Sequence, residues 1–285
     1  MGELSACMEG AAAKGAAEKT FRLPISCFVI AKNEADRLPF TLESVKGWVG
    51  EMIVVVDPAS ADDTADVAAR MGAKTITHAW EGYGPQKCYA ESLCNFPWIL
   101  NLDADESVSP PLRDETIDLF ERYAMRPPFD GFRLSVVTLR PGENAPSFLA
   151  PSNSPVRLYR AEKGGFKNSP VHDSVAFDAP SPVIGKLRGK VHHRSFRSYF
   201  HAVEKINSYS TMQAEDIVRR KKTRFVCVRL ALEPFTAFLK AYFLRRYMFM
   251  GVDGVAESLL YAFARTLRWA KVRELQKKQR HGGDS

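Results

Sequence analysis

Short apolar runs alternate with segments of helical periodicity through the first half of the chain. The runs predict strands and the periodic segments predict helices. Strands are expected at residues 25–31, 52–56, 73–77 and 98–102, and helices at residues 36–48, 60–71 and 86–93. Ser60 is expected to cap the second of these helices, and Gly72 to end it. Strands and helices that alternate through short loops form a parallel sheet with helices on both faces.

The pattern changes from Gly131 onward. Shorter strands are expected at residues 132–139 and 156–160, a further strand is expected to end at His193, and a helix is expected at residues 199–219. We therefore expect the chain to have three regions: a disordered tail over residues 1–22, an α/β domain over residues 23–215, and a basic helical region over residues 216–285.

Acidic side chains follow successive strands of the predicted sheet. Asp57 ends one strand, while Asp103 and Asp105 end another with only Ala104 between them. Residues two apart point the same way in an extended segment, so both carboxylates would face one site for Mg²⁺ or Mn²⁺. The alternative is an acidic loop before the helix that Pro110 opens. Carboxyl ends of parallel strands meet at one edge of a sheet, where nucleotides bind.

The net charge and the cysteine content limit the kinds of partner and compartment to expect. The net charge of +7 and the isoelectric point near 9.1 favour a polyanion: nucleic acid, anionic lipid or a phosphorylated substrate. Five cysteines without a Cys-x-x-Cys pair fit a reducing cytoplasm. The sequence contains neither a Gly-x-Gly-x-x-Gly nor a Gly-Lys-Ser/Thr motif, which argues against a dinucleotide cofactor and the usual ATP loop. It also lacks an uncharged apolar run of transmembrane length.

Three segments carry a family resemblance. Residues 29–34, residues 55–57 with 62–64, and residues 98–106 resemble family 2 glycosyltransferases. Further segments are similar to the lipopolysaccharide inner-core glucosyltransferase group, namely residues 84–87, 156–160, 170–173, and His193 followed by 205–210. The resemblance implies a GT-A fold with a mixed, mostly parallel sheet, an inverting mechanism and a UDP-sugar donor.

The same resemblance implies roles for residues at the donor site. Asp57 would accept a hydrogen bond from the uracil imide, and Asp103 would bind the ribose or a metal-bound water. The full expected donor-binding set is Asn33, Glu34, Asp57, Ser60, Lys87 and Asp103. The sequence departs from the family pattern at Pro58-Ala59-Ser60, where the family has Ser-Gly-Ser, and at Cys88, where the group has Asn.

Asp105, Asp103 and His193 are the expected metal ligands, with Mg²⁺ or Mn²⁺ as the cofactor, since carboxylates and neutral imidazole both bind Mn²⁺. The alternative for His193 is a purely structural role. An inverting transfer also needs a general base on the acceptor hydroxyl. Asp173 stands at the position of that base, where the group more often has Glu. The alternative for Asp173 is a loop acid that pairs with a nearby arginine.

The C-terminal region is basic and rich in aromatic residues. Amphipathic helices of this kind lie on anionic membranes, although they could instead pack on the catalytic domain with a solvated basic rim. The expected protein is a cytoplasmic glycosyltransferase, peripheral on the inner face of the membrane, that moves a hexose to a lipopolysaccharide-core or related glycolipid acceptor. The choice of glucose as the transferred hexose depends on the family resemblance alone. The alternatives are transfer to a polyprenyl phosphate and, in another class, a nucleic-acid-binding protein or a non-catalytic membrane scaffold; nucleic acid is not the expected partner.

Overall fold

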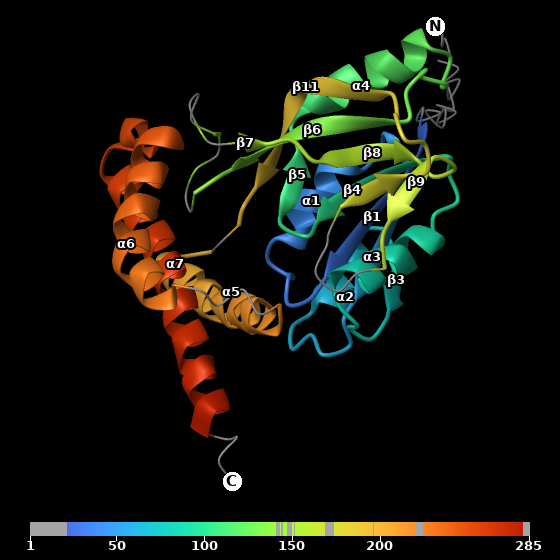
Figure 1. Cartoon of the computed structure of the whole chain (residues 1–285). Coiled ribbons are helices and arrows are strands. Elements are labelled where there is room, and N and C mark those ends of the chain that lie inside the picture. The colour runs from blue at the N-terminus through green and yellow to red at the C-terminus, as the bar shows by residue number, and fades with distance from the viewer. Residues whose placement is uncertain are drawn as a thin grey trace, which may run out of the picture.

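In a computed structural model, the chain forms an α/β domain followed by a group of helices (Figure 1). The structure describes residues 22–140, 143, 145–146, 150, 152–168, 174–195, 197–220 and 225–281. The expected tail over residues 1–22 lies outside this part, apart from Arg22.

Within the described residues, nine strands form one sheet in the order β3-β2-β1-β4-β8-β6-β11-β5, with β7 added beside β6. The first four strands are parallel and alternate with helices, as the hydrophobic pattern predicts. Their bounds are β1 Leu23–Ala31, α1 Leu38–Val45, β2 Val49–Val56, α2 Thr64–Arg70, β3 Lys74–Thr77, α3 Tyr83–Ser92 and β4 Trp98–Asp103.

The second half of the sheet is mixed. β8 is antiparallel to β4 and to β6, whereas β6 and β11 are parallel to each other. The bounds are β5 Glu106–Val108, α4 Pro110–Arg122, β6 Gly131–Thr138, β7 Ser152–Asn153, β8 Val156–Arg160, β9 Gly164–Phe166, β10 Val175–Phe177 and β11 Ile184–His193. β9 and β10 pair as a separate hairpin.

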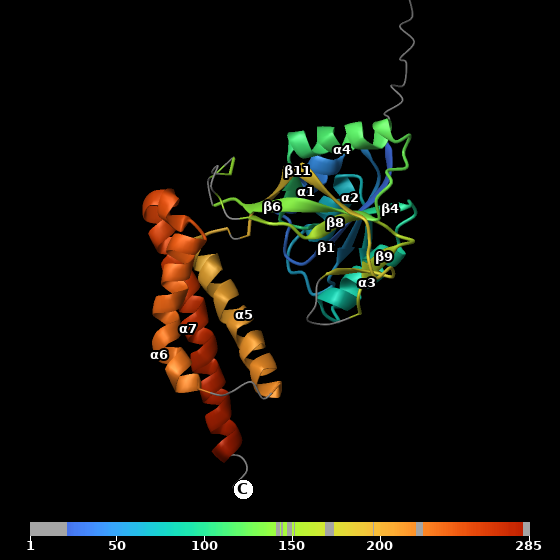
Figure 2. The ribbon, with the colours of Figure 1, turned by 45° about the horizontal axis from the view of Figure 1, so that its top comes forward.

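The sheet has an apolar core on each face because successive residues of a strand point to opposite sides. Cys27 and Val29 of β1 pack toward α1, α2 and α4, whereas Phe28 and Ile30 pack toward α3 and the β9–β10 hairpin. Figure 2 shows α4 and α3 on opposite sides of the strands. These two layers hold the strand ends, and therefore the polar residues that follow them, in fixed positions.

Three long helices form a separate layer beside the sheet (Figures 1 and 2). They are α5 Tyr199–Arg219, α6 Val226–Leu239 and α7 Gly251–His281, with a π-helical turn η1 Lys240–Leu244 and a 3-10 turn η2 Tyr247–Met250 between α6 and α7. Ala214, Val226, Trp269 and Val272 form their shared core. The expected domain boundary after residue 215 therefore falls inside α5. Among the described helices, none combines the length and hydropathy that crossing a bilayer requires.

Candidate active site

The carboxyl ends of β2, β1 and β4 lie side by side. Ala31 is paired with Val56, Ile30 is paired with Asp103, and the Asp57 amide donates to the Ala31 carbonyl over 3.0 Å. Neighbouring strands are about 4.8 Å apart, so the backbones of Asp57 and Asp103 are about 10 Å apart across the end of β1. The structure thus brings these two predicted residues to the same edge of the sheet.

Asp57 is a buried carboxylate with a fixed orientation. Its Oδ1 accepts from the Ala59 amide over 2.8 Å, and the Lys32 ammonium lies 2.8 Å from its Oδ2. The pKa of Asp57 is lowered, chiefly because Lys32 favours the charged form. Asp57 is therefore ionised at neutral pH and can accept a hydrogen bond from a ligand.

The loops after β1 and β2 are tied together by their polar side chains. Asn33 adopts a left-handed conformation (φ 56°), its amide donates to Ser60 Oγ over 3.4 Å, and its Oδ1 accepts from the Ala61 amide over 2.7 Å. The prediction that Ser60 caps the second helix is wrong, because α2 begins at Thr64. The loop after β2 is longer than expected, and the Ser60 side chain contacts the loop after β1 instead.

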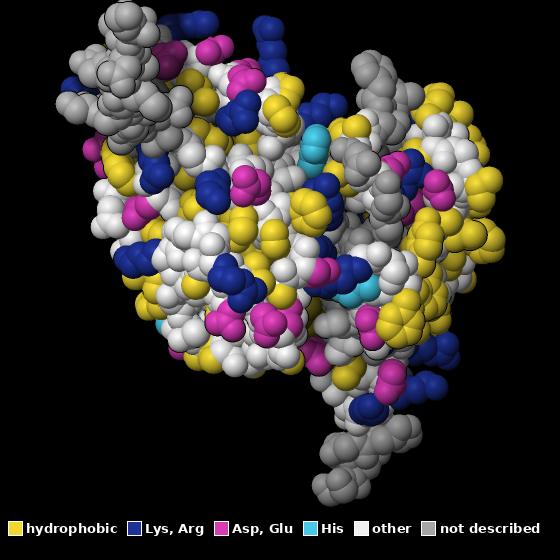
Figure 3. All heavy atoms as spheres, turned by 180° about the vertical axis from the view of Figure 1, so that it is seen from behind, with side chains coloured by type: hydrophobic (Ala, Val, Ile, Leu, Met, Phe, Trp, Pro, Cys, Tyr) yellow, Lys and Arg dark blue, Asp and Glu magenta, His cyan; other side chains and the backbone are white. Residues whose placement is uncertain are grey.

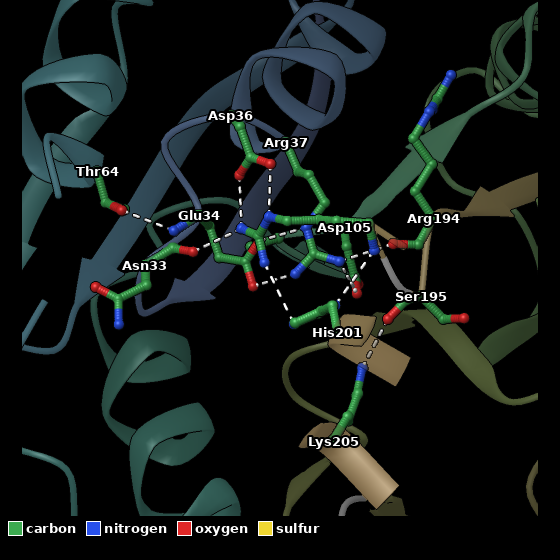
Figure 4. Close-up of polar contacts among 12 residues, drawn as sticks. Asn33, Glu34, Asp36, Arg37, Thr64, Asp105, Arg194, Ser195, His201 and Lys205 are labelled. Atoms are coloured by element: carbon green, nitrogen blue, oxygen red, sulfur yellow. Dashed lines mark hydrogen bonds and ion pairs between the residues drawn. The ribbon is translucent and has the colours of Figure 1, made fainter. Parts of the chain in front are cut away.

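Glu34 lies in a group of ion pairs rather than alone at the strand end (Figure 4). Arg37 donates to its carboxylate through Nε over 2.7 Å, and Arg197 approaches it to 3.4 Å. Arg197 also binds Asp36 over 2.6 Å and the Asn33 carbonyl over 2.8 Å. Burial raises the pKa of Glu34, and the arginines oppose this rise. These contacts join the first strand end to the segment that leads into α5.

Asp103 is held between two buried cations. The Lys87 ammonium lies 3.0 Å from its Oδ1, and the Arg157 guanidinium lies 2.8 Å from its Oδ2. Asn101 Oδ1 accepts from both cations, over 3.3 Å from Lys87 and 2.7 Å from Arg157. Burial alone would raise the pKa of Asp103, but Arg157 and Lys87 outweigh it and hold the pKa well below its usual range. The side chain is 34% exposed, so a ligand can still reach this fixed negative charge.

Asp105 has different neighbours from Asp103. β4 ends at Asp103, and Ala104 and Asp105 form the turn into β5, so the extended geometry that predicted two parallel carboxylates is not present here. Asp105 Oδ2 lies 3.3 Å from His193 Nε2 and 3.3 Å from Arg37. His193 comes to this position because β11 pairs with β5, which sets His193 opposite Glu106.

The carboxylate of Asp105 and the imidazole of His193 are side chains of the kind that bind divalent cations. Magnesium bound with substrate phosphates commonly takes only one or two carboxylates from the protein and keeps water on its other positions. The described residues contain no group of three or more His, Cys, Asp and Glu side chains arranged to hold an ion. Within the predicted set, Asp105 and His193 lie together, and Asp103 lies beside them in ion pairs with Lys87 and Arg157. This arrangement suits a cation carried by a diphosphate better than a permanently bound ion.

One predicted residue cannot be placed, and several residues outside the predicted set contact the site. Asp173, the expected base, lies outside the described residues. Arg37, Arg157 and Arg197 were not among the expected site residues, yet each contacts a predicted acid. A sequence signal exists only for Arg157, which lies inside a short apolar strand, where an unpaired charge would be costly.

Known proteins resemble this chain both in the α/β domain and over most of its length. Residues 26–126 match the family model described as glycosyl transferase family 2. The chain is 41% identical over 263 residues to a protein of Rickettsia typhi named an uncharacterized glycosyltransferase, covering 90% of this chain and 89% of that protein. It is 30% identical over 267 residues to the lipopolysaccharide core biosynthesis glycosyltransferase LpsC of Rhizobium meliloti, covering 88% and 92% of the two chains. Among solved structures, residues 1–349 of S. aureus TarS in complex with UDP-GlcNAc align with a TM-score of 0.42 and 14% identity, over 90% and 92% of the two chains.

Proposed function

The chain belongs to glycosyltransferase family 2, and we propose that it moves a hexose, glucose from UDP-glucose, to a glycolipid acceptor with inversion at the anomeric carbon. Its mixed, mostly parallel sheet is the GT-A fold. The observation that carries the proposal is the position of Asp103: an ionised and accessible carboxylate, held by Lys87 and Arg157, at the sheet edge it shares with Asp57. Relatedness to LpsC supports a lipopolysaccharide-core acceptor.

In the proposed complex, Asp57 accepts a hydrogen bond from the uracil imide and Asp103 accepts one from a ribose hydroxyl. Lys87 and Arg157 are positioning residues here, because they fix the orientation of Asp103 and keep it charged. Asn33 and Ser60 hold the loop that borders the uracil, since they bind each other across two strand ends. Glu34 keeps this loop in place through Arg37.

Asp105 and His193 would hold a Mg²⁺ or Mn²⁺ ion that offsets negative charge on the departing diphosphate. A base removes the proton of the acceptor hydroxyl as its oxygen attacks the anomeric carbon. The bond from this carbon to the diphosphate oxygen breaks on the opposite side, which inverts the configuration. We assign the base role to Asp173, the residue that the family resemblance puts there.

The apolar faces of α6 and α7 support contact with an anionic membrane at the cytoplasmic side. Exposed apolar side chains recur at helical spacing on both helices: Val228, Leu232, Phe235, Leu239 and Phe243 on α6 and η1, and Val252, Val255, Leu259 and Phe263 on α7. We call this set the α6–α7 apolar face. Seen from behind, hydrophobic side chains gather over these helices with Lys and Arg nearby (Figure 3). Residues 225–281 contain 11 Lys and Arg against 4 Asp and Glu. Aromatic and basic side chains in this combination suit the bilayer interface.

The proposal is tested first at the donor. Isothermal titration with UDP-glucose, UDP-GlcNAc, UDP-galactose and GDP-mannose, each with and without Mn²⁺, is expected to show tightest binding for UDP-glucose with the ion. Asp57→Asn is expected to weaken binding of every uridine nucleotide about tenfold or more, because a charge-assisted hydrogen bond is lost. Asp66→Asn, an exposed acid on α2, is the matched control. A wild-type protein that binds no nucleotide sugar in any of these titrations would refute the donor assignment.

Transfer is then measured with radiolabelled UDP-glucose and glycolipid extracted from a strain that lacks the gene for this chain. The expected result is incorporation of label into that glycolipid and no incorporation into glycolipid from the parent strain, whose acceptor position is already filled. Equal incorporation into both preparations would contradict the proposed acceptor.

A further inference from the structure

A polar cavity separates the edge of the sheet from the C-terminal helices. Its volume is about 360 Å³, and its walls come from β6, β7, β11, η2 and α7. Thr138 and Asn153 contribute a hydroxyl and an amide, and Tyr247 and Glu257 face them from the helical side. His193 lines the same cavity. A molecule bound here would therefore lie beside His193, one of the candidate metal ligands.

A second cavity of about 280 Å³ lies between α5 and α7. Its lining is largely apolar and aromatic, with Ile206 and Tyr209 on α5 and Leu260, Tyr261 and Ala264 on α7. Tyr247 and Glu257 line both cavities, so the two meet at these side chains. The site is thus polar at the sheet and apolar between the helices.

Glu257 has an acceptor oxygen that no described residue uses. Its Oε1 is buried and receives no hydrogen bond from any described residue. A buried carboxylate oxygen is normally hydrogen-bonded, because leaving it unsatisfied is costly. Burial also raises the pKa of Glu257. A donor supplied by a ligand, such as a sugar hydroxyl, would satisfy this oxygen.

Backbone packing and an ion pair fix the position of the wall that the two cavities share at Tyr247 and Glu257. Gly254 of α7 lies against the carbonyl of Tyr247, where a Cβ atom would come within 1.9 Å of the oxygen. Arg140, at the end of the β6 segment, binds Asp253 at the start of α7 over 2.9 Å. These contacts hold Tyr247 and Glu257 at a set distance from the sheet edge, so the cavity has a defined shape.

We propose that the two cavities form a single site for an amphipathic acceptor, whose sugar occupies the polar cavity and whose apolar part occupies the cavity between α5 and α7. Glu257 accepts a hydrogen bond from a hydroxyl of the acceptor sugar. The inference rests on the proposed transferase function for the identity of the ligand. It adds the place of the acceptor and a requirement that this acceptor carry an apolar group.

The test compares two acceptors in wild-type protein and in variants of both cavities. The acceptors are the glycolipid from the deletion strain and the water-soluble oligosaccharide released from it by removal of its lipid. Ala264→Phe fills the apolar cavity and is expected to raise KM for the glycolipid about tenfold, with no change for the oligosaccharide. Glu257→Ala removes the hydrogen-bond acceptor and is expected to raise KM for both acceptors about tenfold. Glu257→Gln retains an oxygen there and is expected to restore part of the loss.

Ala270→Phe is the matched control for Ala264→Phe, because it makes the same change at an exposed position of the same helix, outside the α6–α7 apolar face. Ile206→Trp fills the same cavity from the α5 wall and replaces Ala264→Phe if that variant does not fold. UDP-glucose affinity is expected to be unchanged in every variant, since none of the changes touches the donor residues.

Direct binding of each acceptor without donor separates failure of this site from failure of the transferase function. If the variants bind in the expected order but wild-type protein transfers no sugar, the site stands and the transferase function fails. If wild-type protein transfers sugar and Ala264→Phe and Ile206→Trp raise KM for both acceptors equally, or Glu257→Ala changes neither, the two-part site is overturned.

Discussion

The Lys87 ammonium lies 3.0 Å from Asp103 Oδ1 although the Lys87 side chain is completely buried. A buried lysine is stable only when its charge is matched, and here Asp103 and Asn101 face it. Breaking the pair is therefore expected to lower the free energy of unfolding, independently of any effect on nucleotide binding.

Replacing Lys87 by Met is expected to lower the free energy of unfolding by about 3 kcal/mol, because Asp103 keeps Arg157 but loses a buried partner. Urea denaturation followed by circular dichroism measures this change. Lys46→Met is the control, since Lys46 is exposed and 3.9 Å from Glu43, and it is expected to change stability by less than about 0.5 kcal/mol. A loss below about 1 kcal/mol for Lys87→Met would show that burial of the pair contributes little.

Asp105→Asn is expected to lower turnover about 100-fold and to abolish its response to added Mn²⁺, because a neutral amide is a poor ligand for a hard cation. His193→Ala is expected to raise the Mn²⁺ concentration at half-maximal activity about tenfold, since Asp105 remains. Transfer rates over a Mn²⁺ titration measure both. Asp114→Asn, which removes an exposed acid paired with Arg113, serves as the control. A Mn²⁺ response in Asp105→Asn equal to that of wild type would contradict the assigned ligand.

Glu91 on α3 is expected to make the fold less stable as pH rises. Its carboxylate accepts from the Tyr159 hydroxyl and from the Phe166 amide, and burial raises its pKa above the ordinary value of 4.5. Above pH 4.5 the unfolded chain loses this proton before the folded chain does. The folded state then binds more protons, so the free energy of unfolding falls with rising pH until the folded-state pKa is passed.

The difference in stability between wild type and Glu91→Gln isolates this contribution. It is expected to shift in favour of Glu91→Gln as pH rises above 4.5, and then to level off. Urea denaturation at a series of pH values measures the difference. Glu43→Gln, at an exposed position on α1, is expected to show no such shift. A constant difference between wild type and Glu91→Gln across the series would exclude a raised pKa.

Charge placed on the α6–α7 apolar face is expected to reduce membrane binding. The pair of changes Phe235→Glu and Leu239→Glu is expected to lower partitioning onto vesicles of phosphatidylcholine and phosphatidylglycerol at least about tenfold, because apolar burial is lost and repulsion from anionic lipid is added. Vesicle flotation measures the bound fraction.

Val183→Glu is the control for that experiment, because Val183 is also exposed, at 55%, but precedes β11 away from the helices. High salt is expected to weaken wild-type binding through screening of the basic residues. Unchanged flotation in the double variant would place the membrane contact elsewhere or remove it from the function.

The parallel half of the fold was predictable because β1, β2 and β4 are largely apolar runs with a hydrophobic core on each face. The strand order could not be predicted in the same way, because it depends on pairings between distant segments. In particular, β6 and β11 lie parallel to one another beyond β8. The start of α2 differs from the predicted one for a similar reason. Ser60 fits the capping pattern locally, but its hydroxyl is used by Asn33 from another loop.

The acids of the site were easier to predict than the bases that hold them. A carboxylate after a buried strand stands out in the sequence, so Asp57, Asp103 and Asp105 could be identified from the order of residues alone. Arg37 and Arg197 lie in ordinary polar segments and reach the site only through the path of the chain. The sequence places His193 at the end of a strand, but only the pairing of β11 with β5 brings it to Asp105.

The Arg197 guanidinium binds Asp36 and the Asn33 carbonyl, in the loop that borders the candidate nucleotide site, from a position two residues before α5. A displacement of the helical layer, for instance when it binds a lipid surface, would pull on that loop through the Arg197 side chain. Attachment to the bilayer and affinity for the sugar nucleotide would then be thermodynamically linked, so that each strengthens or weakens the other by the same factor.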